Sequence, residues 1–248
     1  MHVHFLGTNG WYNTATGETS CVLIDAPEAY VICDAGQGLH KAGRHLTDSK
    51  KPVYLFLSHL HLDHVYGLHM LPKVKCPQGM TILGQPGTTK HLTQFMASPW
   101  TCPLEKLPFR VTLQDIPEGA HWEPIPFTCR FLVHADPCLG FRFTLDGKTI
   151  AYCTDTGLCN PLVELAQDAD LLIVECAWRR RNESPRWPHL APEDGADVAA
   201  RARAKQLALI HFEANNYPTF AERAEAEQKA RAIFPSTHAM RDDTTITL

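Results

Sequence analysis

The chain has 248 residues, 44% of them hydrophobic, which is enough for one α/β domain with a sizeable core. A formal net charge of −4 argues against a strongly electropositive surface for nucleic acid. The first residues lack a basic region followed by a long apolar run, and the apolar runs are too short to cross a bilayer, so a cytoplasmic protein without membrane association is expected.

The first half of the chain alternates between short apolar runs and helical patterns. Residues 53–57 are continuously apolar, as expected for a strand that is buried on both faces. The segment 99–126 is rich in proline and is expected to be mostly loop. Strands are predicted at 3–6, 20–24, 30–33, 53–57, 80–83 and 110–116, and helices at 37–46 and from 86 to about 97.

The second half shows the same alternation. Asp146-Gly147 between two apolar runs is a strong signal for a hairpin turn. Pro192 suits the first turn of a helix, and the acidic residues after it suit the positive end of the helix dipole. Strands are predicted at 127–133, 140–145, 149–153, 170–175 and 206–210, helices at 162–167, from 192 to about 204 and at 219–234, and an edge strand at 244–248.

Two successive groups of strands and helices indicate two packed sheets with helices outside them. We find no long linker, so residues 1–248 are predicted to form a single α/β domain with approximate internal duplication. The nine cysteines include no Cys-x-x-Cys pair, which argues against a zinc finger or ribbon. Buried, reduced thiols are expected rather than a disulfide framework.

A cluster of potential metal ligands follows the strand predicted at 53–57. Alternate residues of an extended segment point to the same side, so His59 and His61 can approach one metal ion together. Asp63 and His64 fall where the chain turns into a helix and can face a second ion. Imidazole nitrogens and carboxylate oxygens suit zinc, iron or manganese, and this set alone does not choose among them. Three histidines and an aspartate within six positions therefore predict a metal site.

Two ions would need ligands from elsewhere in the chain. Three other predicted strands are followed by polar residues that could supply them, namely His134, Asp155 and His211. A lone histidine at a strand end is usually just a polar residue near the surface, so these assignments depend on the cluster around His59.

The pattern His59-x-His61-x-Asp63-His64 resembles the His-x-His-x-Asp-His signature of the metallo-β-lactamase superfamily. The resemblance extends over nearly the whole chain, which is similar to the ribonuclease Z-like and phosphodiesterase branch of this superfamily. It is carried by Phe5-Leu6-Gly7-Thr8-Asn9-Gly10, Thr19-Ser20-Cys21, Asp34-Ala35-Gly36, Thr154-Asp155-Thr156 and Leu209-Ile210-His211-Phe212. The resemblance implies a four-layer αββα sandwich with the metals at the sheet edges.

The same resemblance implies a ligand set for two divalent ions, with zinc favoured and manganese or iron as alternatives. Asp155 would bridge the two ions together with a water or hydroxide, and Asp63 would also orient the nucleophile. One ion would be held by His59, His61 and His134, and the other by Asp63, His64 and His211.

His189 lies in a second segment that is similar to this branch. There, a histidine at this position lies close to the phosphate and is thought to assist the leaving group, a task that suits imidazole near pH 7. Leu190 and Ala191 stand where a threonine or serine often follows, so the match is weaker at these two positions. An ordinary loop residue is the alternative interpretation of His189.

We expect a metal-dependent hydrolase, and first a phosphodiesterase that acts on a small, cyclic nucleotide or cyclic phosphate. A tRNA 3′-processing endoribonuclease is less favoured, because no long tRNA-binding arm is recognised between His134 and Asp155. The same dinuclear site could support hydrolysis of lactones, thioesters or carboxyl esters. A protein that uses the scaffold without turnover is a further alternative, since a fold does not fix a function.

Two expectations concern the surroundings of the site. The run Arg179-Arg180-Arg181 favours a solvated surface, although its place near His189 would allow contact with a phosphate. Trp178 and Trp187 flank the same segment and could stack on a base. A homodimer is expected from the family resemblance alone.

Overall fold

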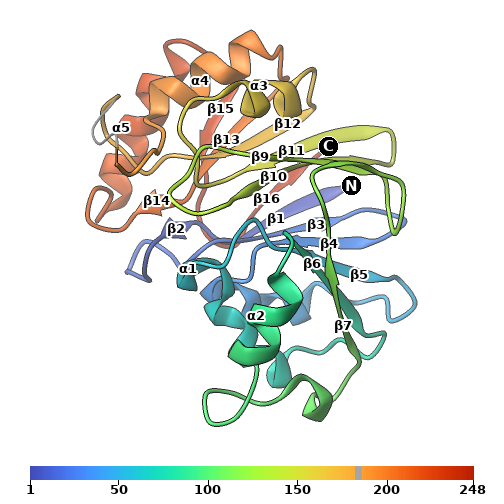
Figure 1. Ribbon diagram of the computed structural model, residues 1–248. Coiled ribbons are helices and arrows are strands. Elements are labelled where there is room, and N and C mark those ends of the chain that lie inside the picture. Colours follow the sequence, from blue (N-terminus) through green and yellow to red (C-terminus); the bar gives the residue numbers. More distant parts are fainter. Residues whose placement is uncertain (182–185) are drawn as a thin grey trace.

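The computed structural model describes residues 1–181 and 186–248, and two facing sheets lie between outer helices in it (Figure 1). The first sheet has the strand order β16 (Thr244–Thr247), β1 (His2–Gly7), β3 (Cys21–Asp25), β4 (Tyr30–Cys33), β5 (Val53–Phe56), β6 (Met80–Gly84) and β7 (Val111–Asp115). The second has the order β15 (Thr237–Ala239), β13 (Leu207–Ile210), β12 (Leu171–Glu175), β11 (Lys148–Cys153), β10 (Leu139–Leu145), β9 (Phe127–Phe131) and β8 (Gly119–His121).

Helices cover the outer face of each sheet. On the first sheet lie η1 (Gln37–Arg44), α1 (Leu62–Val65), η2 (Tyr66–Lys73), α2 (Thr88–Phe95) and η3 (Leu104–Lys106). On the second sheet lie α3 (Asn160–Ala166), α4 (Pro192–Arg201) and α5 (Phe220–Arg231). The result is the four-layer αββα sandwich that the sequence predicts (Figure 1).

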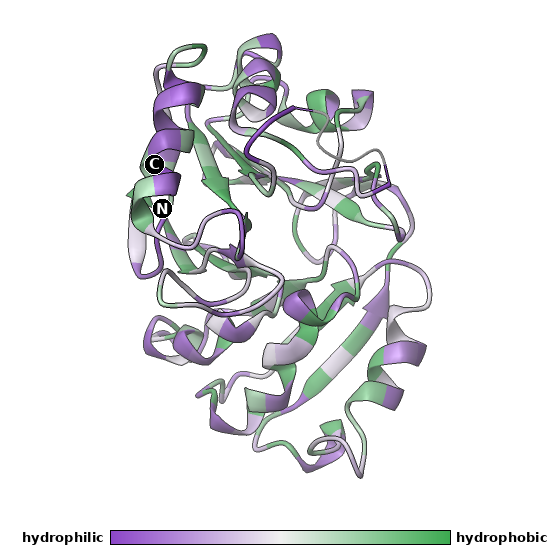
Figure 2. Cartoon of the chain, turned by 90° about the vertical axis from the view of Figure 1, so that its left-hand side faces the viewer, coloured by the Kyte–Doolittle hydropathy of each residue, from purple (hydrophilic) through white to green (hydrophobic). Residues whose placement is uncertain are grey.

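The apolar core lies in the three gaps between these layers. In the central gap, the ring of Phe56 on β5 meets Phe127, Phe141 and Phe143 of the opposite sheet edge-on, with ring centroids 4.9, 5.3 and 4.9 Å away. Two further clusters fill the spaces between each sheet and its helices. Hydrophobic residues accordingly gather along the strands, while the helices carry hydrophilic residues as well (Figure 2).

The two sheets repeat one topology. In each, an antiparallel meander is extended by parallel strands: β1–β3–β4 continues into β5, β6 and β7, and β9–β10–β11 continues into β12, β13 and β15. Parallel strands bring their carboxyl ends to one edge of a sheet, and in open α/β sheets this is the edge where ligands bind. The candidate ligands accordingly follow β5, β11 and β13, and also β9, which runs in the same direction as β11 because both pair antiparallel with β10.

Most predicted elements are present, and the differences have local causes. The helical pattern at 37–46 forms a 3₁₀ helix, η1, rather than an α-helix. The strand predicted at 127–133 ends at Phe131, because Val133 leaves the sheet and its carbonyl accepts the N–H of Gly157. The segment 244–248 does form an edge strand on β1. Within the described residues, no helix is both long and apolar enough to traverse a bilayer.

Candidate metal centre

The histidine cluster occupies the turn between β5 and α1. His59 is fully buried, and its ring centroid lies 4.4 Å from that of His61 and 4.3 Å from that of His64. His61 is extended and directly precedes α1, so Asp63 and His64 fall in the first turn of that helix. The chain thus bends around the cluster, as its spacing predicts.

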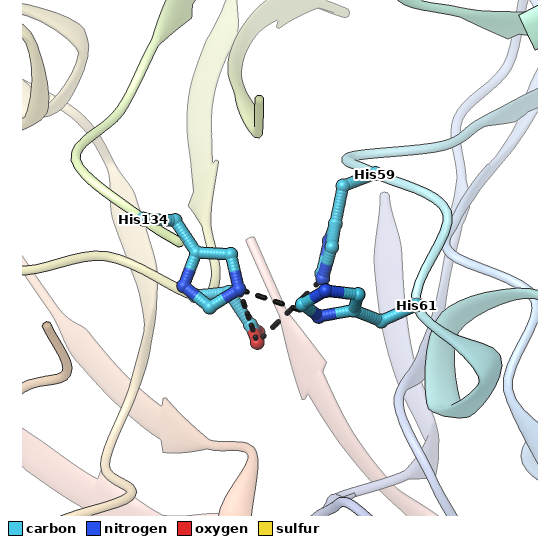
Figure 3. Close-up of side chains that lie close together, drawn as sticks. His59, His61 and His134 are labelled. Carbon is cyan, nitrogen blue, oxygen red and sulfur yellow. Dashed lines mark hydrogen bonds and ion pairs between the residues drawn. The ribbon is translucent and has the colours of Figure 1, made fainter. Parts of the chain in front are cut away.

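A first group forms when His134 and Asp155 join His59 and His61 from the opposite sheet. Candidate ligand atoms of these four residues all lie within 4.8 Å of one another. His134 Nε2 is 3.4 Å from His61 Nδ1, and the Nε2 atoms of His59 and His134 are each 3.8 Å from Asp155 Oδ2. Figure 3 shows the three rings turned toward one another around this carboxylate oxygen.

A second group consists of Asp63, His64 and His211, whose candidate ligand atoms also lie within 4.8 Å of one another. His64 Nε2 and His211 Nε2 are 3.2 Å apart. Asp155 Oδ1 lies 3.1 Å from His211 Nε2 and 3.3 Å from His64 Nε2. Asp155 therefore directs one carboxylate oxygen at each group, and all seven residues singled out as ligands in the sequence meet in one place.

This centre has the chemistry of a cation site. His59 Nε2 is buried, has no hydrogen-bond partner and lies on the side of the Asp155 carboxylate. The ring nitrogen on the other side of each of three histidines is engaged: His59 Nδ1 with Ser58, His61 Nε2 with Asp136, and His64 Nδ1 with Asp34. Such outer partners fix the tautomer and orientation of metal-binding imidazoles. The donor set of imidazoles and carboxylates fits zinc, manganese or iron.

The charges of the group support the same interpretation. Burial opposes ionisation of Asp155, but His211 and His64 outweigh it and hold the pKa of this carboxyl well below its usual range. Burial lowers the pKa of His59 far below its usual value, and the neighbouring His64 acts in the same direction. His59 and Asp155 are thus in the forms that bind metal. At His64 and His211 burial opposes the charge on the imidazole, but Asp155 outweighs it and raises the pKa of both side chains.

Asp34 is a buried partner that the sequence marked only as part of the family likeness. Its Oδ2 accepts hydrogen bonds from His64 Nδ1 and Tyr152 Oη, both at 2.8 Å, and from Ser58 Oγ at 2.9 Å. Its Oδ1 accepts the backbone N–H of Ser58 at 2.7 Å. This carboxylate connects the end of β4 to the opposite sheet and fixes which nitrogen His64 directs at the centre.

His61 has a very different partner. Its Nε2 pairs with Asp136 Oδ2 at 2.8 Å, and both side chains are accessible to solvent, 34% for His61 and 65% for Asp136. The pair leaves Nδ1 of His61 facing the first group. Nothing in the sequence around Asp136 indicated this contact, since it joins two loops 75 positions apart.

The backbone around the centre is unusual. Asp34, Asp155 and His211 adopt positive φ values of 59°, 55° and 51°, and Trp11 has 72°. Such conformations are strained for residues other than glycine, and they concentrate at functional sites. Gly10 packs directly on the His211 ring, where an added Cβ would lie 2.6 Å from Cε1.

A buried arginine supports this segment. Arg223 of α5 is 1% exposed and donates hydrogen bonds to Asn9 Oδ1, to Thr8 Oγ1 at 2.9 Å and to Thr16 Oγ1 at 3.1 Å. It also lies over the ring of Phe212, 4.5 Å from the centroid. Phe212 belongs to β14 (Phe212–Glu213), which pairs with β2 (Asn9–Gly10). Arg223 therefore contacts both strands of the short sheet beside His211 and holds them together.

His189 lies at the rim of the centre, with its ring centroid 5.2 Å from that of His134 and 6.0 Å from that of His211. Its Nδ1 pairs at 2.7 Å with Glu175 Oε1, at the end of β12. Burial opposes the charge on this imidazole, but Glu175, with Asp155 and Asp63 behind it, raises the pKa of His189 to about 9. Glu175 is fully buried, and the sequence had given it no role.

The run Arg179-Arg180-Arg181 follows β12, and two of its side chains pair with the outer helices. Arg179 Nη2 pairs with Glu225 of α5 at 2.7 Å. Arg181 pairs with Asp197 of α4 at 2.5 Å and with Asp194 at 3.4 Å. Two of the three arginines are thus engaged by the outer helices, which favours the interpretation as a structural surface.

Comparisons with known proteins agree with this geometry. Residues 22–212 match the family described as the Beta-lactamase superfamily domain. The chain is 27% identical to ribonuclease Z of Thermosynechococcus vestitus over 308 residues, covering 98% of this chain and 74% of that protein. The alignment is longer than the 248 residues of this chain, so the relative carries additional segments.

Two solved structures share the fold. Human tRNase Z, short form, superposes with a TM-score of 0.76 at 22% identity and covers 100% of this chain and 99% of its own. A structure described as a new diphosphatase from the PhnP family gives a TM-score of 0.74 at 15% identity, covering 100% of this chain and 97% of its own.

Proposed function

This chain belongs to the beta-lactamase superfamily and is a metal-dependent hydrolase, and on that premise we propose that it is a phosphodiesterase acting on a small nucleotide or cyclic phosphate. The observation that carries the proposal is the Asp155 carboxylate, which directs one oxygen at each of two histidine-containing groups. A relative named ribonuclease Z and a structural neighbour described as a diphosphatase support phosphorus chemistry.

We propose that the centre holds two divalent ions, zinc being the first expectation. The first group, His59, His61 and His134, would hold one ion, and the second group, Asp63, His64 and His211, would hold the other, with Asp155 between them. When bound, such a pair lowers the pKa of water and stabilises charge on phosphoryl oxygens.

The chain's own residues would orient the reactants and move protons. His64 and His211 outweigh the burial of Asp63 and hold the pKa of its carboxyl well below its usual range, so Asp63 stays ionised and can orient an attacking water. Asp63 Oδ2 is fixed by the N–H of Trp11 at 2.7 Å. His189 engages Glu175 through Nδ1, which leaves Nε2 to donate a proton to the departing alkoxide.

Processing of tRNA precursors is a less favoured alternative. Between His134 and Asp155 the chain forms only the β10–β11 hairpin with its Asp146-Gly147 turn, and we infer that a long substrate-clamping arm has no place there. Hydrolysis of lactones, thioesters or carboxyl esters remains the other alternative on the same centre.

Elemental analysis combined with hydrolysis assays tests the proposal. We expect about two metal ions per chain and turnover of bis(p-nitrophenyl) phosphate or of 2′,3′- or 3′,5′-cyclic nucleotides. In Asp155→Ala, kcat should fall by more than about 100-fold, because both groups lose their shared carboxylate. Two metals without phosphodiester turnover would favour lactones and thioesters. Protein that stays metal-free when offered zinc, iron or manganese would refute the ligand set.

Two further properties belong to the proposal. All nine cysteines are free, and seven of them are buried, so we propose that the protein resides in the reducing cytoplasm. We also propose a homodimer, which analytical ultracentrifugation would test.

A further inference from the structure

Large apolar side chains are exposed on the segments that carry the candidate metal ligands. Leu62 precedes Asp63, Val133 precedes His134, and Leu158 follows Asp155 by three positions. The most prominent are two tryptophans: Trp11 is 66% exposed, and Trp187, two positions before His189, is 53% exposed. An apolar rim around a polar centre marks a surface that binds a partner or ligand.

Trp11 is the rim residue most directly tied to the centre. Its backbone N–H donates a hydrogen bond of 2.7 Å to Asp63 Oδ2, so the backbone of Trp11 lies directly against a candidate metal ligand. Its φ of 72° is a true outlier for a bulky residue. Neither exposure nor this conformation helps folding, and backbone strain of this kind is common at functional sites.

The loop that presents Trp11 is fixed in place before any ligand arrives. Asn9 Nδ2 donates to the carbonyl of Tyr12 at 3.1 Å and to Thr14 Oγ1 at 2.9 Å. Tyr12 Oη donates to Asn215 Oδ1 at 2.7 Å, which joins this loop to the segment after β14. The tilted rings of Trp11 and Tyr12 have centroids 6.0 Å apart. A rigid aromatic surface loses little conformational entropy when a flat group stacks on it.

The charges nearby indicate what kind of group would lie there. In the described part of the chain, no lysine or arginine pairs with a carboxylate of the centre. Arg179 and Arg181 are engaged by the outer helices. The exposed indole of Trp11 offers a planar, uncharged face, and every nucleobase can stack on such a face.

We propose that Trp11 is a specificity-determining residue that stacks on the nucleobase of a nucleotide substrate while the phosphodiester lies over the metal centre. The inference rests on the proposed phosphodiesterase function and deepens it.

Paired substrates test the stacking. For adenosine 2′,3′-cyclic phosphate, Trp11→Ala should lower kcat/KM about tenfold, mainly through KM, because stacking on an aromatic side chain contributes appreciably to the binding of each base. Trp11→Phe should restore most of the loss. Methyl riboside 2′,3′-cyclic phosphate has no base, and its kcat/KM should change less than about twofold. Trp100→Ala, on the exposed loop after α2, is the matched control and should affect neither substrate.

Binding without turnover gives an independent measurement. Adenosine 5′-monophosphate should quench the tryptophan fluorescence of the wild type and much less that of Trp11→Phe, whereas ribose 5-phosphate should quench neither. Equal losses for both cyclic substrates in Trp11→Ala would overturn the stacking while leaving the phosphodiesterase in place. Unchanged kinetics with lost self-association would instead assign Trp11 to a subunit contact. If the wild type cleaves neither of these substrates, and neither 3′,5′-cyclic nucleotides nor bis(p-nitrophenyl) phosphate, the proposed function itself fails.

Discussion

The two candidate metal groups share Asp155, but His64 of the second and His61 of the first are supported in opposite ways. In the second group, His64 is held by Asp34, and both side chains are fully buried. In the first group, His61 is held by Asp136 on an exposed loop. A buried hydrogen-bond network is costly to break, whereas an exposed pair contributes little to stability. The comparison indicates that His64 is built into the core of the fold, whereas the orientation of His61 can be changed from the surface.

The largest effect should follow from Asp34→Asn. The amide would put hydrogen-bond donors where His64, Ser58 and Tyr152 now donate to Oδ2. Both the stability of the fold and the metal affinity of the second group should therefore fall. We expect the free energy of unfolding to fall by about 3 kcal/mol or more and metal affinity of the second group to fall about 10- to 100-fold. Denaturant unfolding and competition with a chromophoric chelator measure these two quantities.

Asp115→Asn is the matched control for that change. Asp115 is the last residue of β7, a parallel strand of the first sheet, but its oxygens accept hydrogen bonds from Gly87 and Thr89 at the start of α2. The substitution Asp115→Asn should lower the free energy of unfolding by about 1 kcal/mol and leave metal binding unaltered. Wild-type affinity at both groups in Asp34→Asn would show that the buried carboxylate does not prepare the second group.

An intermediate effect is expected from Gly10→Ala. The new methyl group would lie 2.6 Å from the His211 ring, so the ring or the β2 backbone must move. Overpacking of this kind costs about 1–3 kcal/mol. Cobalt substitution monitors the outcome, since the absorption of the ion at the second group should change while that at the first stays as in the wild type. Unaltered spectra would mean that the segment can shift without displacing His211.

The smallest effect should come from Asp136→Asn. The exposed pair with His61 contributes little to folding, so the free energy of unfolding should change by less than about 0.5 kcal/mol. The metal affinity of the first group should still fall about tenfold, because His61 loses the carboxylate that fixes its orientation. A stability loss as large as that of Asp34→Asn would remove the contrast between the two groups.

The sequence was most informative where residues act through local spacing. His59, His61, Asp63 and His64 follow one strand, and their convergence with His134, Asp155 and His211 agrees with the family resemblance. Most strands followed from apolar periodicity, and the order of the predicted elements indicated two packed sheets with outer helices. The family resemblance implied the four-layer αββα sandwich. The short strands β2, β8, β14 and β15 were missed, because two or three residues carry no readable periodicity.

The supporting residues could not be predicted for a different reason. Asp34, Asp136 and Glu175 form hydrogen bonds with partners 14 to 118 positions away in the sequence. The residues adjacent to them in the sequence do not indicate such contacts. The strained φ of Trp11 and the buried guanidinium of Arg223 likewise depend on how the two-stranded β2–β14 sheet is packed.

The repeated topology also has a consequence for the order in which the protein can mature on the ribosome. The ribosome synthesises His59, His61, Asp63 and His64 together with the first sheet. Their partners His134, Asp155 and His211 emerge about 70 to 150 residues later. The edge strand β16, which closes the first sheet beside β1, comes last of all. The nascent first half therefore holds an incomplete ligand set and an open sheet edge, and a complete metal centre can form only once nearly the whole chain has emerged.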